Sequence, residues 1–179
     1  PTDVEDETTG DAIDGDAMTG ADTFFNECEE LGIAEAWEGS FNGLIVHDIQ
    51  IPEDWGYLIP GDLPVSGSLS FSISCINSKF YVDGNLDGAA TAEGDDYPFT
   101  TTIQGYYDPE TGQLNANIVD GAVVIQIAEV YFEGLFIGSL LEDGNFEGTW
   151  SGYAAGTNLG EFITGDATGN GNWEATPSL

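Results

Sequence analysis

The stretch SLSFSISC at residues 68–75 decides the fold class. Every second residue is serine, and the residues between them are leucine, phenylalanine, isoleucine and cysteine. A strict period of two places the apolar side chains on one face of a β-strand and the serines on the other. The segment therefore predicts a half-buried strand with one face toward a core.

The same alternation recurs along most of the chain after Ser40. It is clear in FTTTIQGYY at 99–107 and, beyond the turn DPETG at 108–112, in QLNANI at 113–118. Weaker strand patterns cover residues 44–49, 123–127, 130–138, 145–152, 161–164 and 172–175. Strands at this spacing predict an all-β fold, an antiparallel β-sandwich or barrel of roughly 8–10 strands.

Two Asp-Gly pairs, at 83–84 and 143–144, predict tight hairpin turns, because type I′ turns need positive φ. They lie in two similar phrases, VDGNLDG at 82–88 and EDGNFEG at 142–148. Either a duplicated hairpin unit or the convergence of two unrelated turns explains the similarity.

The composition of the chain changes at about residue 22. Residues 1–22 are acidic, rich in Gly, Thr and Ala, and almost free of large apolar side chains, which is typical of an extension or linker. Residues 23–179 are expected to form a single β domain. Its first part, at about 23–31, is expected to be a short helix capped by Thr23.

The two cysteines, Cys28 and Cys75, lack the CxxC spacing of a redox or zinc site. They predict one disulfide in an oxidising compartment, with two buried free thiols as the alternative. The sequence starts at Pro1 without a charged and apolar leader, which favours a processed, exported chain. The expected location is therefore the exterior or surface of a bacterium or archaeon.

The charge of the chain excludes several partners. It has 33 acidic residues, a single basic one (Lys79) and a formal net charge of −32. Nucleic-acid binding and polybasic membrane association need clustered Lys and Arg, and phosphoryl chemistry needs an Arg or Lys clamp. No nucleic-acid partner and no direct membrane insertion are therefore expected. Because nearly all carboxylates lack a basic partner in the sequence, cations must screen them, which favours a saline or calcium-rich exterior.

Two acidic clusters are candidate cation ligands. The first comprises Asp11, Asp14 and Asp16, and the second comprises Glu93, Asp95 and Asp96. Carboxylate oxygens are the ligands that Ca²⁺ prefers, so binding of calcium or another divalent cation is a hypothesis for these clusters. The alternative is a solvated run of charge, and no cofactor is expected to be required.

No catalytic constellation emerges from the sequence. The single histidine, His47, lies in the strand-like run LIVHDI at 44–49 and is expected to face outward. A glycosidase needs two carboxylates roughly 5 to 10 Å apart. Among 33 Asp and Glu residues such pairs arise by chance, so they are no evidence for this activity. The chain is therefore expected not to be an enzyme.

Aromatic residues supply the candidates for ligand stacking. Trp55 and Tyr57 lie in the loop-like segment PEDWGY at 52–57, whereas Trp150 is expected in the core. GTW at 148–150 resembles the G-x-W of small ligand-binding barrels such as the avidins and lipocalins. The resemblance covers three residues, and no ligand is inferred from it.

The leading hypothesis is a secreted, non-enzymatic structural subunit of an extracellular filament, sheath or surface layer. Residues 1–22 would lie along the sheet edge of a neighbouring copy, with Val4, Ile13 and Met18 as apolar anchors and cations bridging the carboxylates. This predicts a homo-oligomer or polymer. The alternatives are a surface-tethered binding module for a glycan or small ligand and, more weakly, a glycoside-active enzyme.

Overall fold

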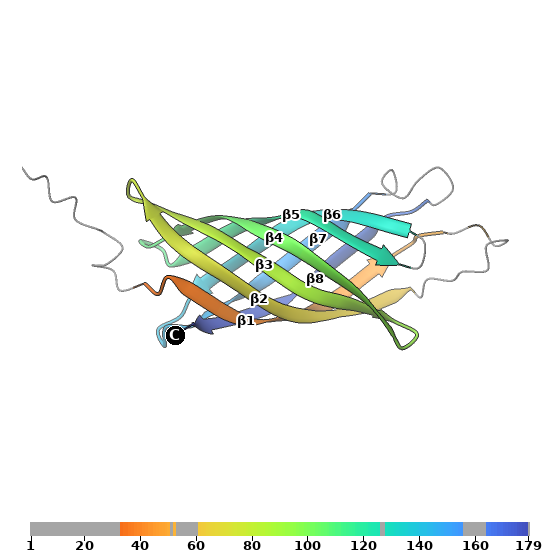
Figure 1. Ribbon diagram of the computed structural model, residues 1–179, viewed down its shortest axis with the longest axis horizontal. Helices are drawn as coiled ribbons and strands as arrows, with labels where there is room; N and C mark the ends of the chain where they lie inside the picture. The colour runs from red at the N-terminus through yellow and green to blue at the C-terminus, as the bar shows by residue number, and fades with distance from the viewer. Residues whose placement is uncertain (1–32, 51, 53–60, 126–127, 156–163, 179) are drawn as a thin grey trace, which may run out of the picture.

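Eight long antiparallel strands, each hydrogen-bonded to the next along the chain, close into a barrel (Figure 1). The computed structural model describes residues 33–50, 52, 61–125, 128–155 and 164–178. The strands are β1 (Ala36–His47), β2 (Asp62–Ile76), β3 (Lys79–Ala92), β4 (Asp95–Asp108), β5 (Gln113–Ile125), β6 (Ala128–Leu140), β7 (Phe146–Ala154) and β8 (Ala167–Pro177). Pairing of β1 with β8, from Trp37 opposite Pro177 to His47 opposite Ala167, closes the barrel.

The all-β prediction is confirmed, and of its two forms the barrel is the one observed. In β2, Leu69, Phe71 and Ile73 are buried inside the barrel, whereas the serines between them are exposed on its outer face. The other strands follow the same rule, because a side chain in a small closed barrel points either into the core or to solvent. The helix expected at about 23–31 and the extension 1–22 lie outside the described residues. The described part of the chain contains no helix of the length and apolarity that crossing a membrane requires.

The predicted turn at 83–84 is wrong. Asp83 and Gly84 lie in the middle of β3, where Gly84 is paired with Phe71 of β2. A Cβ at position 84 would overlap the carbonyl oxygen of Ser70, so this glycine permits a close approach of two strands. The pair at 143–144 does form the β6–β7 turn, with Gly144 at φ 83°. The two similar phrases therefore occupy different structural positions and are not a duplicated hairpin.

The segment predicted as a strand at 113–118 and the described part of the one predicted at 123–127, residues 123–125, belong to one strand, β5. A register shift between Ile118 and Gly121 marks a β-bulge, where Asp120 adopts a φ of 55°. The buried hydroxyl of Thr101 donates a 2.7 Å hydrogen bond to the carbonyl oxygen of Val119 at this bulge. The polar Thr101 side chain thus satisfies a backbone group that the bulge would otherwise leave unpaired.

The predicted turn at 108–112 is confirmed, and Asp108 holds it together. Its carboxylate accepts hydrogen bonds from the Thr111 hydroxyl at 2.8 Å and from the Glu110 backbone N–H at 2.9 Å. These bonds, the Thr111 hydroxyl first, hold the pKa of Asp108 below its ordinary value. Gly112 completes the turn at φ 70°.

Aromatic side chains fill one half of the barrel, which we call the closed end. There the strands are joined by short turns at 77–78, 109–112 and 141–145. Trp37 meets Phe146 edge to face at 4.7 Å between ring centroids, and Phe136 stacks on Trp173 at 4.2 Å. Such pairs combine a large buried apolar area with favourable ring geometry.

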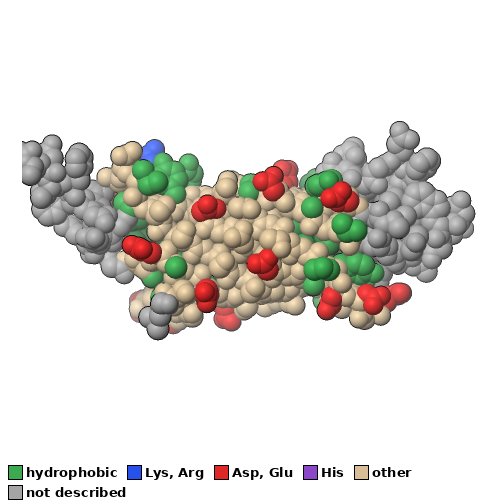
Figure 2. Space-filling model, viewed as in Figure 1, with side chains coloured by type: hydrophobic (Ala, Val, Ile, Leu, Met, Phe, Trp, Pro, Cys, Tyr) green, Lys and Arg blue, Asp and Glu red, His purple; other side chains and the backbone are tan. Residues whose placement is uncertain are grey.

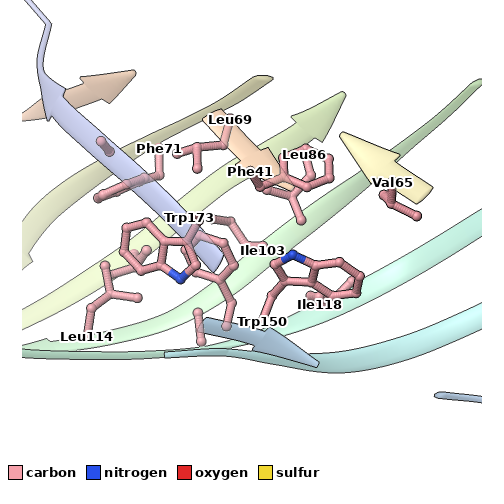
Figure 3. Packing of buried hydrophobic residues seen from close by; sticks show 14 of the residues in the cluster. Phe41, Val65, Leu69, Phe71, Leu86, Ile103, Leu114, Ile118, Trp150 and Trp173 are labelled. Atoms are coloured by element: carbon pink, nitrogen blue, oxygen red, sulfur yellow. The ribbon is translucent and has the colours of Figure 1, made fainter. Parts of the chain in front are cut away.

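Trp173 fits in the closed end because the neighbouring strands carry glycines beneath it. A Cβ at Gly148 would lie 2.5 Å from Cε2 of the indole, and one at Gly138 would overlap Cζ2. The indole N–H donates to the carbonyl oxygens of Ile137 and Thr149, both at 3.2 Å. Figure 3 shows the ring beside Phe71 and Leu114.

We predict that Gly148→Ala lowers the free energy of unfolding by about 1–3 kcal/mol, because the added methyl overlaps the backbone of β6 and the indole of Trp173. Gly152→Ala, on the same strand, is the matched control. A Cβ there meets its nearest atoms at 3.7 and 3.9 Å, which is ordinary contact, so a change under about 1 kcal/mol is expected. Urea unfolding of the two variants measures both, and equal losses would contradict this account of the closed end.

Candidate functional site

The other half of the barrel, which we call the open end, holds an apolar cavity of about 70 Å³. At this end β1, β3, β5 and β7 finish and the following strands begin. The apolar side chains on its wall come from all eight strands. They include Phe41, Ile45, Leu63, Val65, Leu86, Ala90, Phe99, Ile118, Val123, Val130, Phe132, Trp150, Ala154 and Ala167.

The cavity exists because the inward positions of β7 and β8 change size along the barrel. Near the closed end they carry Phe146 and Trp173, whereas near the open end they carry Gly152, Ala154, Ala167 and Gly169. Ala90 of β3 adds another small wall residue and is fully buried. Small side chains on three strands leave volume that the aromatic residues of the closed end do not reach.

Phe41 and Trp150 form the floor of the cavity, at the boundary between the two halves. Their rings meet edge to face at 6.4 Å, and Phe99 and Phe132 continue the aromatic wall with a 5.6 Å contact. The indole N–H of Trp150 donates to the carbonyl oxygen of Asn42 at 3.0 Å. The backbone thus satisfies the indole N–H of Trp150. The Trp150 side chain is buried, which confirms the expectation that it belongs to the core.

His47 lines the cavity, so the expectation that it faces outward is wrong. The physical reason is the strand period, because residues 41, 43, 45 and 47 of β1 all point inward. The backbone N–H of Ile49 donates to Nδ1 of His47 at 3.1 Å, which places the proton of a neutral ring on Nε2. Among the described residues around the cavity, His47 is the polar side chain at an inward position, whereas Tyr153 occupies an outward position of β7 and is exposed.

The second acidic cluster lies in the β3–β4 hairpin at the open end. Glu93, Asp95 and Asp96 are all exposed, and Thr91 donates a 2.8 Å hydrogen bond to Asp96. Within the described residues, no three His, Cys, Asp or Glu side chains are grouped so that they could hold a metal ion. Calcium binding stays a prediction, and Asp11, Asp14 and Asp16 lie outside the described residues.

Several other predicted site residues also fall outside the described part of the chain: Val4, Ile13, Met18, Cys28, Trp55 and Tyr57. The segment that carries Trp55 and Tyr57 joins β1 to β2 at the open end. Cys75 is half-buried near the closed end of β2 and forms no disulfide with another described residue. Its pairing with Cys28 stays a prediction.

The closed barrel bears on the assembly mechanism expected from the sequence. That mechanism needs a free sheet edge, and within the described residues each strand pairs on both sides. An added strand therefore finds no edge on this barrel. The assembly function itself is not tested by this observation.

The outer surface carries a groove of about 590 Å³ over β6, β7, β8 and β1. Its polar side chains include Ser40, Asn42 and Thr149, and two exposed carboxylates, Glu147 and Glu174, are direct partners across the β7–β8 pair. The sequence pattern did not single out this pair, because residues 27 positions apart meet only through strand register. No Asp or Glu lines the apolar cavity in the described part of the chain.

Comparison of the chain with protein-family models, with curated proteins and with solved structures found no match. The functional argument therefore depends on the geometry of the barrel. Its most specific feature is the contrast between a solid aromatic half and a hollow apolar half in one closed sheet.

Proposed function

We propose that this chain is a non-enzymatic binding protein that takes a small, mainly apolar ligand into the open end of its barrel. The observation that carries the proposal is the apolar cavity above Phe41 and Trp150. Concave sites with apolar walls and few polar groups are the usual form of small-molecule sites, and the mouths of β-barrels are one of their usual places.

The cost of the cavity supports this reading. An unfilled void destabilises a protein by about 24 cal/mol per Å³, so 70 Å³ represents about 2 kcal/mol of lost stability. Larger side chains at Ala90, Ala154 or Ala167 would recover part of it. A chain that keeps small residues on three strands at one level of the barrel retains space at the expense of stability, which is a common condition of binding sites.

The size of the cavity favours a slim ligand. The enclosed volume suits a short alkyl chain or part of a ring, and each methylene buried there contributes about 0.8 kcal/mol. Among the described residues of the wall, His47 is the polar side chain at an inward position, and it lies near the mouth, so any polar group of the ligand is expected at that end. This proposal develops the binding-module alternative and leaves open whether a glycan forms part of the ligand.

Assembly into an extracellular structure is a second candidate function, and one surface feature favours it. Large apolar side chains are exposed on the outer face of β5, β6 and β7: Val124, Tyr131, Leu135, Ile137 and Tyr153. Figure 2 shows hydrophobic side chains toward the two ends of the barrel and acidic groups along its whole length. Contacts through such a face would replace the sheet-edge mechanism, and the acidic surface suits a saline exterior.

The assembly candidate predicts that the full chain sediments as oligomers in about 1 M NaCl, where the repulsion between acidic copies is screened. Leu135→Asp places a charge in the middle of the outer apolar face and is expected to yield monomers. Leu44→Asp, on the outer face of β1, is the control and should leave the oligomers intact. A monomeric native chain in sedimentation velocity would remove this candidate.

The binding proposal predicts that 1-octanol binds the native chain and that Ala90→Leu weakens its binding at least about tenfold, because the larger side chain fills the cavity. Ala89→Leu is the matched control, since the neighbouring residue of β3 points to the outer face and should leave binding unchanged. Titration followed by methyl NMR measures the affinities, and thermal unfolding checks that both variants are folded. Absence of binding to the native chain, or equal weakening by the two variants, would contradict the proposal.

A further inference from the structure

We infer that the ligand of the open end is an amphiphile with an apolar tail and a cationic head group, and that the barrel discriminates against anionic amphiphiles. The inference rests on the proposed function and adds the chemical class of the ligand. It combines the depth of the cavity with the charges around its mouth.

The depth of the cavity places the head group of any amphiphile at the mouth. Phe41 and Trp150 close the cavity below, and the packed rings of the closed end leave no passage beyond them. A volume of about 70 Å³ holds only part of a tail. The remainder of the molecule, with its head group, must therefore lie near the ends of the strands.

Exposed carboxylates lie at the open end of the barrel. Asp48 follows β1, Asp62 begins β2 and Asp166 precedes β8. Oδ1 of Asp48 accepts a 2.6 Å hydrogen bond from the Asp166 backbone N–H, which ties the two connections together. The acidic β3–β4 hairpin at 93–96 lies at the same end of the barrel, next to β2.

The described residues at the mouth include no Lys or Arg. The chain contains no Arg, and Lys79, its single Lys, begins β3 at the closed end. An anionic head group at the mouth would therefore meet carboxylates without the Lys or Arg partner that binds carboxylate or phosphate groups. A quaternary or primary ammonium head group is instead attracted by these carboxylates and by the negative charge of the chain as a whole.

Three probes with the same eight-carbon tail separate tail binding from head-group selection: octyltrimethylammonium, 1-octanol and octanoate. At about 0.01 M salt the Debye length is about 30 Å, so the mouth carboxylates act almost unscreened. We expect octyltrimethylammonium to bind at least about tenfold more tightly than octanoate, with 1-octanol between them. At about 1 M salt, where the Debye length falls to about 3 Å, the ratio should fall below about threefold.

A pair of triple variants tests the location of the effect. Asp48→Asn/Asp62→Asn/Asp166→Asn removes three charges at the mouth. Glu38→Gln/Glu147→Gln/Glu174→Gln removes three exposed charges from the strands nearer the closed end and has the same net charge. The mouth variant should reduce the cation-to-anion ratio at least about threefold, and the control should change it less than about 1.5-fold. Equal reductions would overturn the assignment to the mouth.

The outcomes separate this inference from the proposed function. Binding of 1-octanol without a preference between the two charged probes would overturn the inference and leave the binding function in place. Failure of all three probes to bind would overturn the binding function itself. Thermal unfolding of each variant confirms that the comparison is made between folded proteins.

Discussion

The fit of Trp173 against the glycines of β6 and β7 is the constraint on which the rest of the barrel depends. An eight-stranded barrel is just wide enough to be filled by side chains, and the indole of Trp173 fits inside because two inward positions next to it lack a Cβ. Gly138 and Gly148 supply that space, and the carbonyl oxygens of Ile137 and Thr149 accept the indole N–H. With this ring in place, Phe136, Phe146 and Trp37 pack into a solid half.

The hollow half has the opposite cause: its inward side chains on β7 and β8 are small, so they leave space inside the barrel. β7 and β8 carry Phe146 and Trp173 at inward positions near the closed end, whereas every inward residue of these strands beyond Trp150 toward the open end is Gly or Ala, so the barrel is filled below Trp150 and unfilled above it. The packed aromatic half stabilises the barrel and so offsets the cost of the cavity. The cavity in turn can hold an apolar ligand. The acidic groups then attract or repel the head group of the ligand, which remains at the mouth.

The sequence predicted the all-β class and several strands, because alternation in segments such as 68–75 is a local property. It also held the information that places His47 inside, since His47 is six residues from the buried Phe41 on one strand. Barrel closure was not predictable in the same way, because it depends on pairing β1 with β8, more than a hundred residues apart. The turn predicted at Asp83-Gly84 was wrong for a related reason. The pair has the sequence of a turn, but the glycine is needed because β2 approaches too closely for a Cβ. The cavity depends on which residues of eight strands share one level of the barrel, and register alone determines that.

The central claim is that one half of the barrel is solid and the other is hollow and apolar. Crystals of the full chain under xenon pressure test it most directly, because xenon enters dry apolar cavities and gives strong scattering. The account predicts xenon in the open end, in contact with Phe99, Val123 and Val130, and none among Trp37, Phe146 and Trp173. Xenon bound in the aromatic half, or a barrel that takes up no xenon, would contradict it.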